Sequence, residues 1–128
     1  MRKTVLIVDE NAFIRHALYE LFQREADIEV CGVAENGQEA IDEAARLHPD
    51  LIVLDVSMPG MNGLETARVL KRRFHAVLVI MFGMFGASAD TFSEPLAEMI
   101  GVPEFVSKSE RVTVLIAKAR GLLYPHAA

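Results

Sequence analysis

The chain of 128 residues lacks most of the features that mark secreted or membrane proteins. It has one cysteine, Cys31, so no disulfide framework can form within it, which agrees with a reducing cytoplasm. No apolar run approaches the ~20 residues that span a bilayer. Met1 to Lys3 lead into an apolar run without the pattern of a signal peptide. These absences predict a cytoplasmic protein with no membrane partner.

Positive charge is also scarce. The chain has 13 Lys and Arg against 18 Asp and Glu, a formal net charge of −5, which argues against direct binding of nucleic acid by this segment. Hydrophobic residues make up 52% of the chain, which is enough to build a core. Cys31 lies in an apolar segment and is interpreted as a small buried hydrophobe.

Strand-length apolar runs alternate with amphipathic helical patterns. The expected strands are 5–8, 28–33, 51–54, 77–82 and 104–107, and the expected helices are 11–25, 36–47, 63–74, 91–100 and 109–123, with a loop at 83–89. This alternation predicts an α/β fold, with a parallel sheet covered by helices on both faces. Residues 1–123 are expected to form one domain, and 124–128 the start of a linker or an artificial end.

The helical patterns also predict caps and core-facing side chains. Asn11 and Ser109 are expected to cap the first and last helices. Phe13, Ala17, Leu18, Leu21 and Phe22 are expected to face inward from the first helix, and Ala40, Ile41, Ala44 and Ala45 from the second. The expected solvent-facing side chains of the third helix are those of Arg68, Lys71, Arg72 and Arg73.

Acidic residues follow two of the strand-like runs. One run ends in Asp9 and Glu10, and the run 51–54 ends in Asp55. If these strands are parallel neighbours, the three carboxylates meet beyond their carboxyl ends, where such sheets bind ligands. Carboxylates so close repel unless a cation lies among them, and their hard oxygens suit Mg²⁺. The pattern predicts a metal-dependent acidic pocket in which Asp55 can act as a nucleophile towards phosphorus.

The chain as a whole resembles the receiver domain of two-component response regulators. The resemblance is carried by Asp9-Glu10, by the run Asp55-Val-Ser-Met-Pro-Gly-Met-Asn-Gly63, by the run Gly101-Val-Pro-Glu-Phe-Val-Ser-Lys108 and by the strand–helix order. It implies a flavodoxin-like doubly wound sheet of strand order 2-1-3-4-5. Ser109 after Lys108, together with Met-Pro-Gly-Met-Asn-Gly, is similar to the subfamily that carries a helix-turn-helix output domain.

The resemblance also implies roles and partners. Asp55 would be the phosphoacceptor, Mg²⁺ would be held by Asp9, Glu10, Asp55 and the carbonyl of Ser57, Lys108 would pair with the phosphoryl group, and Phe105 would be the switch aromatic. A histidine kinase or phosphotransfer protein would donate the phosphoryl group. A homodimer is expected, and DNA would be contacted only through an output domain absent from this chain. The receiver would be a regulator, with at most self-phosphorylation and self-dephosphorylation chemistry.

The sequence departs from the family at the end of the fourth strand, where the family has a Ser or Thr hydroxyl. Counting from Asp55 puts this position near Met81 to Gly83, and counting from Lys108 puts it near Gly86; none of these residues carries a hydroxyl. Ser88 and Thr91 are the nearest substitutes. The usual coupling of phosphate to the neighbouring helix is therefore in question.

Three functions stay open at this point. The first is a phosphorylatable receiver that regulates an output, which is expected to be transcription. The second is a receiver-like module that acts through protein interaction or dimerisation without phosphorylation. The third, the least favoured, is a hydrolase of small phosphate esters. Plainer roles also exist: Glu10 can cap a helix, Lys108 can be a solvated charge, and Phe105 can pack in the core.

Overall fold

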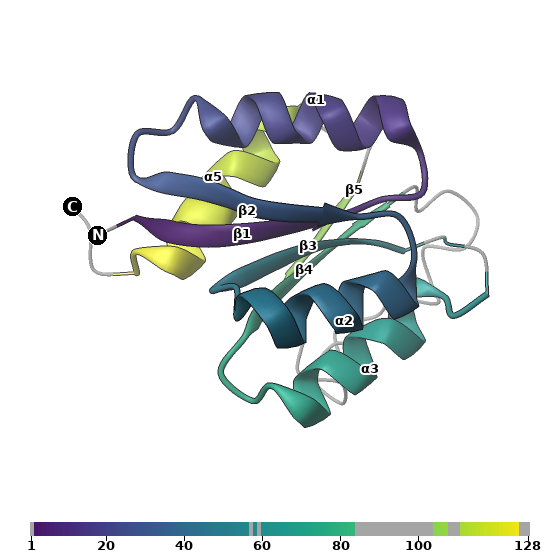
Figure 1. Ribbon diagram of the computed structural model, residues 1–128. Helices are drawn as coiled ribbons and strands as arrows, with labels where there is room; N and C mark the ends of the chain where they lie inside the picture. The colour runs from purple at the N-terminus through teal and green to yellow at the C-terminus, as the bar shows by residue number, and fades with distance from the viewer. Residues whose placement is uncertain (1, 57, 59, 84–103, 108–110, 126–128) are drawn as a thin grey trace.

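The computed structural model describes residues 2–56, 58, 60–83, 104–107 and 111–125. Its centre is a parallel sheet in the order β2-β1-β3-β4-β5 (Figure 1). The strands are β1 (Lys3–Val8), β2 (Ile28–Ala34), β3 (Leu51–Asp55), β4 (Leu78–Gly83) and β5 (Glu104–Ser107). This order confirms the flavodoxin-like fold class, and each predicted strand is present within two residues of its expected bounds.

Helices cover both faces of the sheet (Figure 1). The described helices are α1 (Ala12–Gln23), α2 (Gly37–Leu47), α3 (Gly63–Arg73) and α5 (Val112–Leu123). α1 and α5 lie on one face, and α2 and α3 lie on the other. The helix expected at 91–100 lies outside the described residues.

Alternation along β3 divides the core into two clusters. Ile52 and Leu54 pack towards α2 and α3, whereas Leu51 and Val53 pack towards α1 and α5. Every residue of β3 is buried, as its unbroken apolar run predicts for a central strand covered on both faces. The last of them is Asp55, so the core itself holds the candidate phosphoacceptor in place.

Asparagine caps begin three of the helices. Asn11 accepts hydrogen bonds from the backbone N–H groups of Phe13 and Ile14, as predicted. Asn36 accepts from Glu39 and Asn62 from Glu65 in the same way. These side chains satisfy N–H groups that have no partner within the helix, and each fixes where the chain turns from a strand end into a helix.

Two packing predictions and one capping prediction are wrong. Phe13 is 83% exposed, because the side of α1 that packs on the core runs through Ile14, Leu18 and Phe22. Ala45 is exposed, because α2 turns it away from the sheet. α5 begins at Val112 with Arg111 in the N-cap position and no side-chain cap, so the predicted cap is wrong, and Ser109 itself lies outside the described residues.

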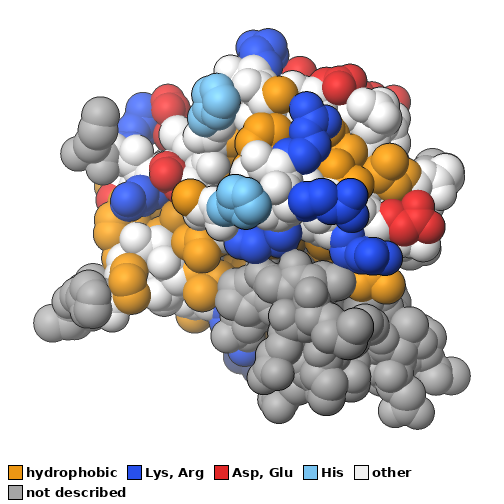
Figure 2. Space-filling model, turned by 90° about the horizontal axis from the view of Figure 1, so that it is seen from below, with side chains coloured by type: hydrophobic (Ala, Val, Ile, Leu, Met, Phe, Trp, Pro, Cys, Tyr) orange, Lys and Arg blue, Asp and Glu red, His pale blue; other side chains and the backbone are white. Residues whose placement is uncertain are grey.

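The α3 side of the molecule carries a concentration of basic side chains (Figure 2). Arg68, Arg72 and Arg73 are exposed as predicted. Lys71 is partly buried instead, and its Nζ donates to the backbone oxygens of Val77 at 2.6 Å and His75 at 3.3 Å. Burial lowers the pKa of Lys71, whose ammonium ties the end of α3 to the start of β4.

In the part of the chain that the structure describes, no helix has both the length and the apolar character to cross a bilayer.

Candidate functional site

The register of the sheet brings Asp9 and Asp55 to neighbouring strand ends. β1 and β3 pair from Val5 opposite Leu51 to Val8 opposite Leu54, so the next residue on each strand is an aspartate. Asp9 is 1% exposed and Asp55 is 2% exposed. Two buried carboxylates at neighbouring strand ends repel each other unless positive charge lies near them, and the carboxyl edge of a parallel sheet is where such sheets bind ligands.

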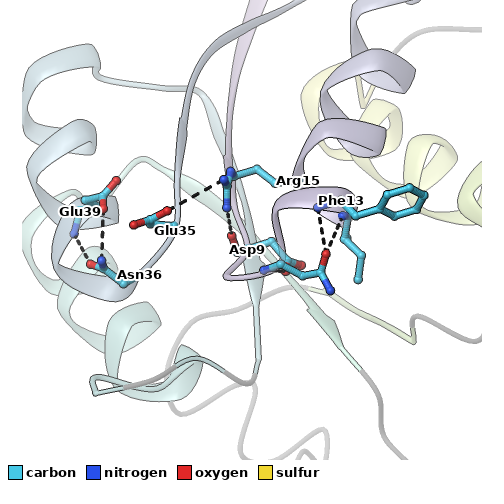
Figure 3. A network of polar contacts seen from close by, with 8 residues as sticks. Asp9, Phe13, Arg15, Glu35, Asn36 and Glu39 are labelled. Carbon is cyan, nitrogen blue, oxygen red and sulfur yellow. Dashed lines mark hydrogen bonds and ion pairs between the residues drawn. The ribbon is translucent and has the colours of Figure 1, made fainter.

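Asp9 is fixed by the start of α1 (Figure 3). Its Oδ1 accepts a hydrogen bond from the backbone N–H of Asn11 at 2.9 Å, and its backbone oxygen accepts from Nη1 of Arg15 at 2.8 Å. Nη2 of Arg15 also lies 3.9 Å from a carboxylate oxygen of Glu35. Arg15 thus links the ends of β1 and β2 beside the acidic pair, a positioning role that the sequence patterns did not reveal.

Glu10 is exposed, in contrast to its neighbour Asp9. Among the described residues, no three Asp, Glu, His or Cys side chains are grouped closely enough to hold a metal ion. Asp9 and Asp55 still suit Mg²⁺, because this ion is commonly bound by one or two carboxylates and keeps several waters. The role of Glu10 and the backbone of Ser57, which lies outside the described residues, stay predictions.

Close backbone contacts hold the segment after Asp55. The N–H of Val56 donates to the backbone oxygen of Phe82 at 3.2 Å, and the N–H of Gly63 donates to that of Val56 at 3.0 Å. A Cβ on residue 63 would lie 2.3 Å from the backbone oxygen of Asp55. Only glycine allows α3 to begin so close to the candidate phosphoacceptor.

β4 ends in Gly83, beside the site. Phe82 pairs with Asp55, and Gly83 is the last residue of the strand. The described end of β4 therefore carries no hydroxyl, as the sequence predicts. Gly86 and the possible substitutes Ser88 and Thr91 lie outside the described residues.

Lys108 and Phe105 are the remaining predicted site residues. Lys108 lies outside the described residues. The backbone of Phe105 belongs to β5 and pairs with Met81 of β4, while its side chain is not described. The assignments of Lys108 and Phe105 stay predictions.

Cys31 is partly buried, with its Sγ 3.5 Å from the backbone oxygen of Val5, and burial raises its pKa. A raised pKa disfavours the reactive thiolate, in line with a packing role.

The model of the response regulator receiver domain family matches residues 5–120. This chain therefore belongs to the family of response regulator receiver domains. Among solved structures, the chain is similar to the response regulator domain of Thermotoga maritima CheB, with a TM-score of 0.83, 28% identity, and coverage of 96% of this chain and 97% of that one. A LuxR-family response regulator from Aurantimonas shares the fold, with a TM-score of 0.87 at 24% identity over 98% of this chain and 87% of that one.

Relatives among characterised proteins are longer than this chain. It is 36% identical over 104 residues to a protein-glutamate methylesterase/protein-glutamine glutaminase of Pyrococcus horikoshii, covering 81% of this chain and 28% of that protein. It is 38% identical over 87 residues to the nitrate/nitrite response regulator NarL of Escherichia coli, covering 68% and 40% respectively. The chain thus spans well under half of each, and the similarity covers a receiver domain, which is not itself catalytic.

Proposed function

We propose that this receiver accepts a phosphoryl group on Asp55 and uses the change to regulate an output. The observation that carries the proposal is the burial of Asp55 at the end of the central strand, next in register to a second buried carboxylate, Asp9. A lone surface aspartate would need no such placement. The donor is a histidine kinase or a phosphotransfer protein.

In the proposed reaction a carboxylate oxygen of Asp55 attacks phosphorus and forms a P–O bond. The P–N bond to the donor histidine breaks, and its imidazole leaves with the electron pair. Asp55 is well held for this attack, because its strand is buried and α3 packs on its backbone through Gly63. Arg15 and Asn11 hold Asp9 at the adjacent strand end.

Mg²⁺ is the proposed cofactor, with Asp9, Asp55, Glu10 and the backbone of Ser57 as its protein ligands. When bound, the ion neutralises charge that develops on the transferring phosphoryl oxygens. Without a cation, the adjacent carboxylates would repel an anionic donor as well as each other. Lys108 is proposed to add a further positive charge at the same edge.

The experiment that tests this function is intact-mass spectrometry after incubation with acetyl phosphate. We expect one phosphoryl adduct that requires Mg²⁺ and is absent from Asp55→Asn, because the amide is not a nucleophile. Asp42→Asn, which changes an exposed aspartate on α2, is the matched control and should be phosphorylated like the wild type. An adduct that persists on Asp55→Asn would contradict the assignment.

A second candidate function is favoured by the absence of a hydroxyl at the end of β4. It is a receiver-like module that acts through protein interaction or dimerisation without phosphorylation. This candidate predicts no adduct with acetyl phosphate or with phosphoramidate as the donor. It also predicts an oligomeric state that sedimentation finds unchanged by Mg²⁺ and either donor.

The output is proposed to be transcription, through a DNA-binding domain elsewhere in the full protein, in a cytoplasmic homodimer. The similarity to a nitrate/nitrite response regulator supports this choice. The similarity to methylesterases supports a different output on the same receiver. The sequence of the complete gene distinguishes the two, because the former requires a helix-turn-helix domain and the latter a methylesterase domain.

A further inference from the structure

Val56 and Gly83 meet where β3 and β4 end. A Cβ placed on residue 83 would lie 2.7 Å from both the Cβ and the Cγ2 of Val56. Non-bonded carbon atoms are best separated by about 3.5–4.0 Å, so this space is already filled. The side chain of Val56 therefore occupies the place that any side chain at position 83 would need.

Val56 is held in this place from the other side. Its backbone oxygen accepts a hydrogen bond from Gly63 at 3.0 Å, and a Cβ on Gly63 would lie 2.7 Å from its Cα. Its side chain packs against the cluster that contains Leu54, Met58 and Met81. Val56 thus lies between the start of α3 and the end of β4, and a side chain at position 83 could not displace it without moving one of them.

Position 83 is the end of described β4 on the same face of the sheet as Val56. Phe82, which pairs with Asp55, packs into the opposite cluster, towards α1 and α5. Position 83 is one of those to which the count from Asp55 assigns the family hydroxyl. A hydroxyl-bearing side chain there is excluded by more than the substitution by glycine, because Val56, directly after β3, already fills the space.

We propose that Val56 uncouples β4 from the phosphoryl group, so that the response to phosphorylation stays on the β3–α3 segment. The inference rests on the function proposed above. With position 83 reduced to backbone and its space filled by Val56, the last residue of β4 offers no side chain that could follow the phosphoryl group. Val56 is a positioning residue in this account, since it acts through the packing of β3 against β4 and not on the reacting atoms.

The steric part is tested by thermal unfolding of three variants. Gly83→Ser should lower Tm by at least about 5 °C, because a core position is overpacked. Combining it with Val56→Gly, which exchanges the glycine between the strands, should recover most of the loss. Val56→Gly with Gly83→Ala is the matched control without a hydroxyl. A Gly83→Ser variant as stable as the wild type would contradict the claim that Val56 fills the space needed by a side chain at position 83.

The coupling part is tested by methyl NMR of the full chain, with beryllofluoride and Mg²⁺ as the phosphoryl mimic. Two native methionines report on the two sides: Met58 follows Asp55, and Met81 lies in β4, and both are buried. We expect the Met58 methyl resonance to shift on adding the mimic and the Met81 resonance to stay. In the Val56→Gly/Gly83→Ser protein both methyl resonances should shift. In the Val56→Gly/Gly83→Ala control only the Met58 resonance should shift.

The outcomes separate this inference from the proposed function. Wild-type protein that forms the acetyl phosphate adduct, but whose Met81 resonance moves as far as that of Met58, would overturn the inference alone. Wild-type protein that forms no adduct would overturn the proposed function, and the inference with it. An exchange variant that is stable and phosphorylated, yet leaves Met81 unmoved, would show that Val56 does not control the coupling.

Discussion

Aspartates at the two ends of the sheet serve different purposes. Asp27 and Asp50 precede strands β2 and β3, are partly exposed, and are held by hydrogen bonds. Arg120 donates to both carboxylate oxygens of Asp27, at 2.6 and 2.9 Å, and the backbone N–H of Thr4 donates to Asp50 at 2.8 Å. Asp9 directly follows β1 and Asp55 ends β3, and both are buried at neighbouring strand ends. The same residue type therefore ties elements together at the amino edge, whereas at the carboxyl edge it is buried where the chemistry is proposed.

The largest expected effect concerns the crowded carboxyl edge. Gly63→Ala places a Cβ 2.3 Å from the backbone oxygen of Asp55, which no rotamer change can relieve, so it should destabilise the protein by about 1–3 kcal/mol or more. Gly121→Ala in α5 is the matched control, because nothing lies within 4 Å of its Cβ position. That change should stabilise by roughly 0.5–1 kcal/mol. Chemical denaturation measures the change in the free energy of unfolding for both variants. Equal changes would contradict the claim that the start of α3 is crowded against Asp55.

At the amino edge, Asp50→Ala should cost about 1–3 kcal/mol, because Asp50 accepts hydrogen bonds from the N–H and the hydroxyl of Thr4, which it leaves without their acceptor. Asp42→Ala on α2 is the control. Asp42 is exposed and bonds only to Gln38 among the described residues, so its loss should stay within about 0.5 kcal/mol. Urea unfolding measures the free energy of unfolding of the two variants. Similar losses of stability would mean that the contacts with Thr4 do not stabilise the fold.

Asp9→Asn should stabilise the protein, in contrast to the two changes above. It keeps an oxygen for the Asn11 N–H and removes a charge beside Asp55, so at neutral pH without metal we expect a gain of about 0.5–2 kcal/mol. Mg²⁺ should raise the Tm of the wild type more than that of the variant, because the wild type binds it more tightly. A variant less stable than the wild type without Mg²⁺ would mean that Asp9 supports the fold.

The smallest effect is a pH dependence at the amino edge. The hydrogen bonds from Arg120 lower the pKa of Asp27 below its ordinary value of 3.8. A lowered folded-state pKa gives stability that is present above pH 3.8 and is lost as the pH falls through the depressed value. The Tm difference between wild type and Arg120→Gln should therefore narrow below pH 3.8. A difference that is constant across this range would assign the effect of Arg120 to packing, such as its contact with the ring of Tyr124.

Much of the fold could be predicted because its signals are local. Apolar runs gave the strands, Asn11 gave a cap, and acids after two strands gave the acidic edge, since parallel strands share an edge. Phe13 was misplaced because α1 has adjacent apolar residues at 13 and 14, and periodicity alone does not tell which of them faces the sheet. Glu10 was grouped with Asp9 by its place in the sequence and by the family resemblance, neither of which reveals that Glu10 is exposed and Asp9 buried.

Other parts of the site depend on distances that a sequence does not contain. The contact between Arg15 and the Asp9 carbonyl joins a helix to a strand end, and an arginine in a helix has many other uses. The filling of the Gly83 position by Val56 depends on how closely two strand ends approach. The sequence revealed that a hydroxyl was missing, but not that its space was taken.

The central claim is that the buried carboxylate of Asp55 receives the phosphoryl group, and chemical trapping tests it without any substitution. Wild-type protein treated with acetyl phosphate and Mg²⁺ is reduced with borohydride, which converts an aspartyl phosphate to homoserine, and is then mapped by peptide mass spectrometry. The account predicts homoserine at position 55 alone, and only when Mg²⁺ is present. Homoserine at another acid, or an adduct that borohydride does not reduce, would contradict it.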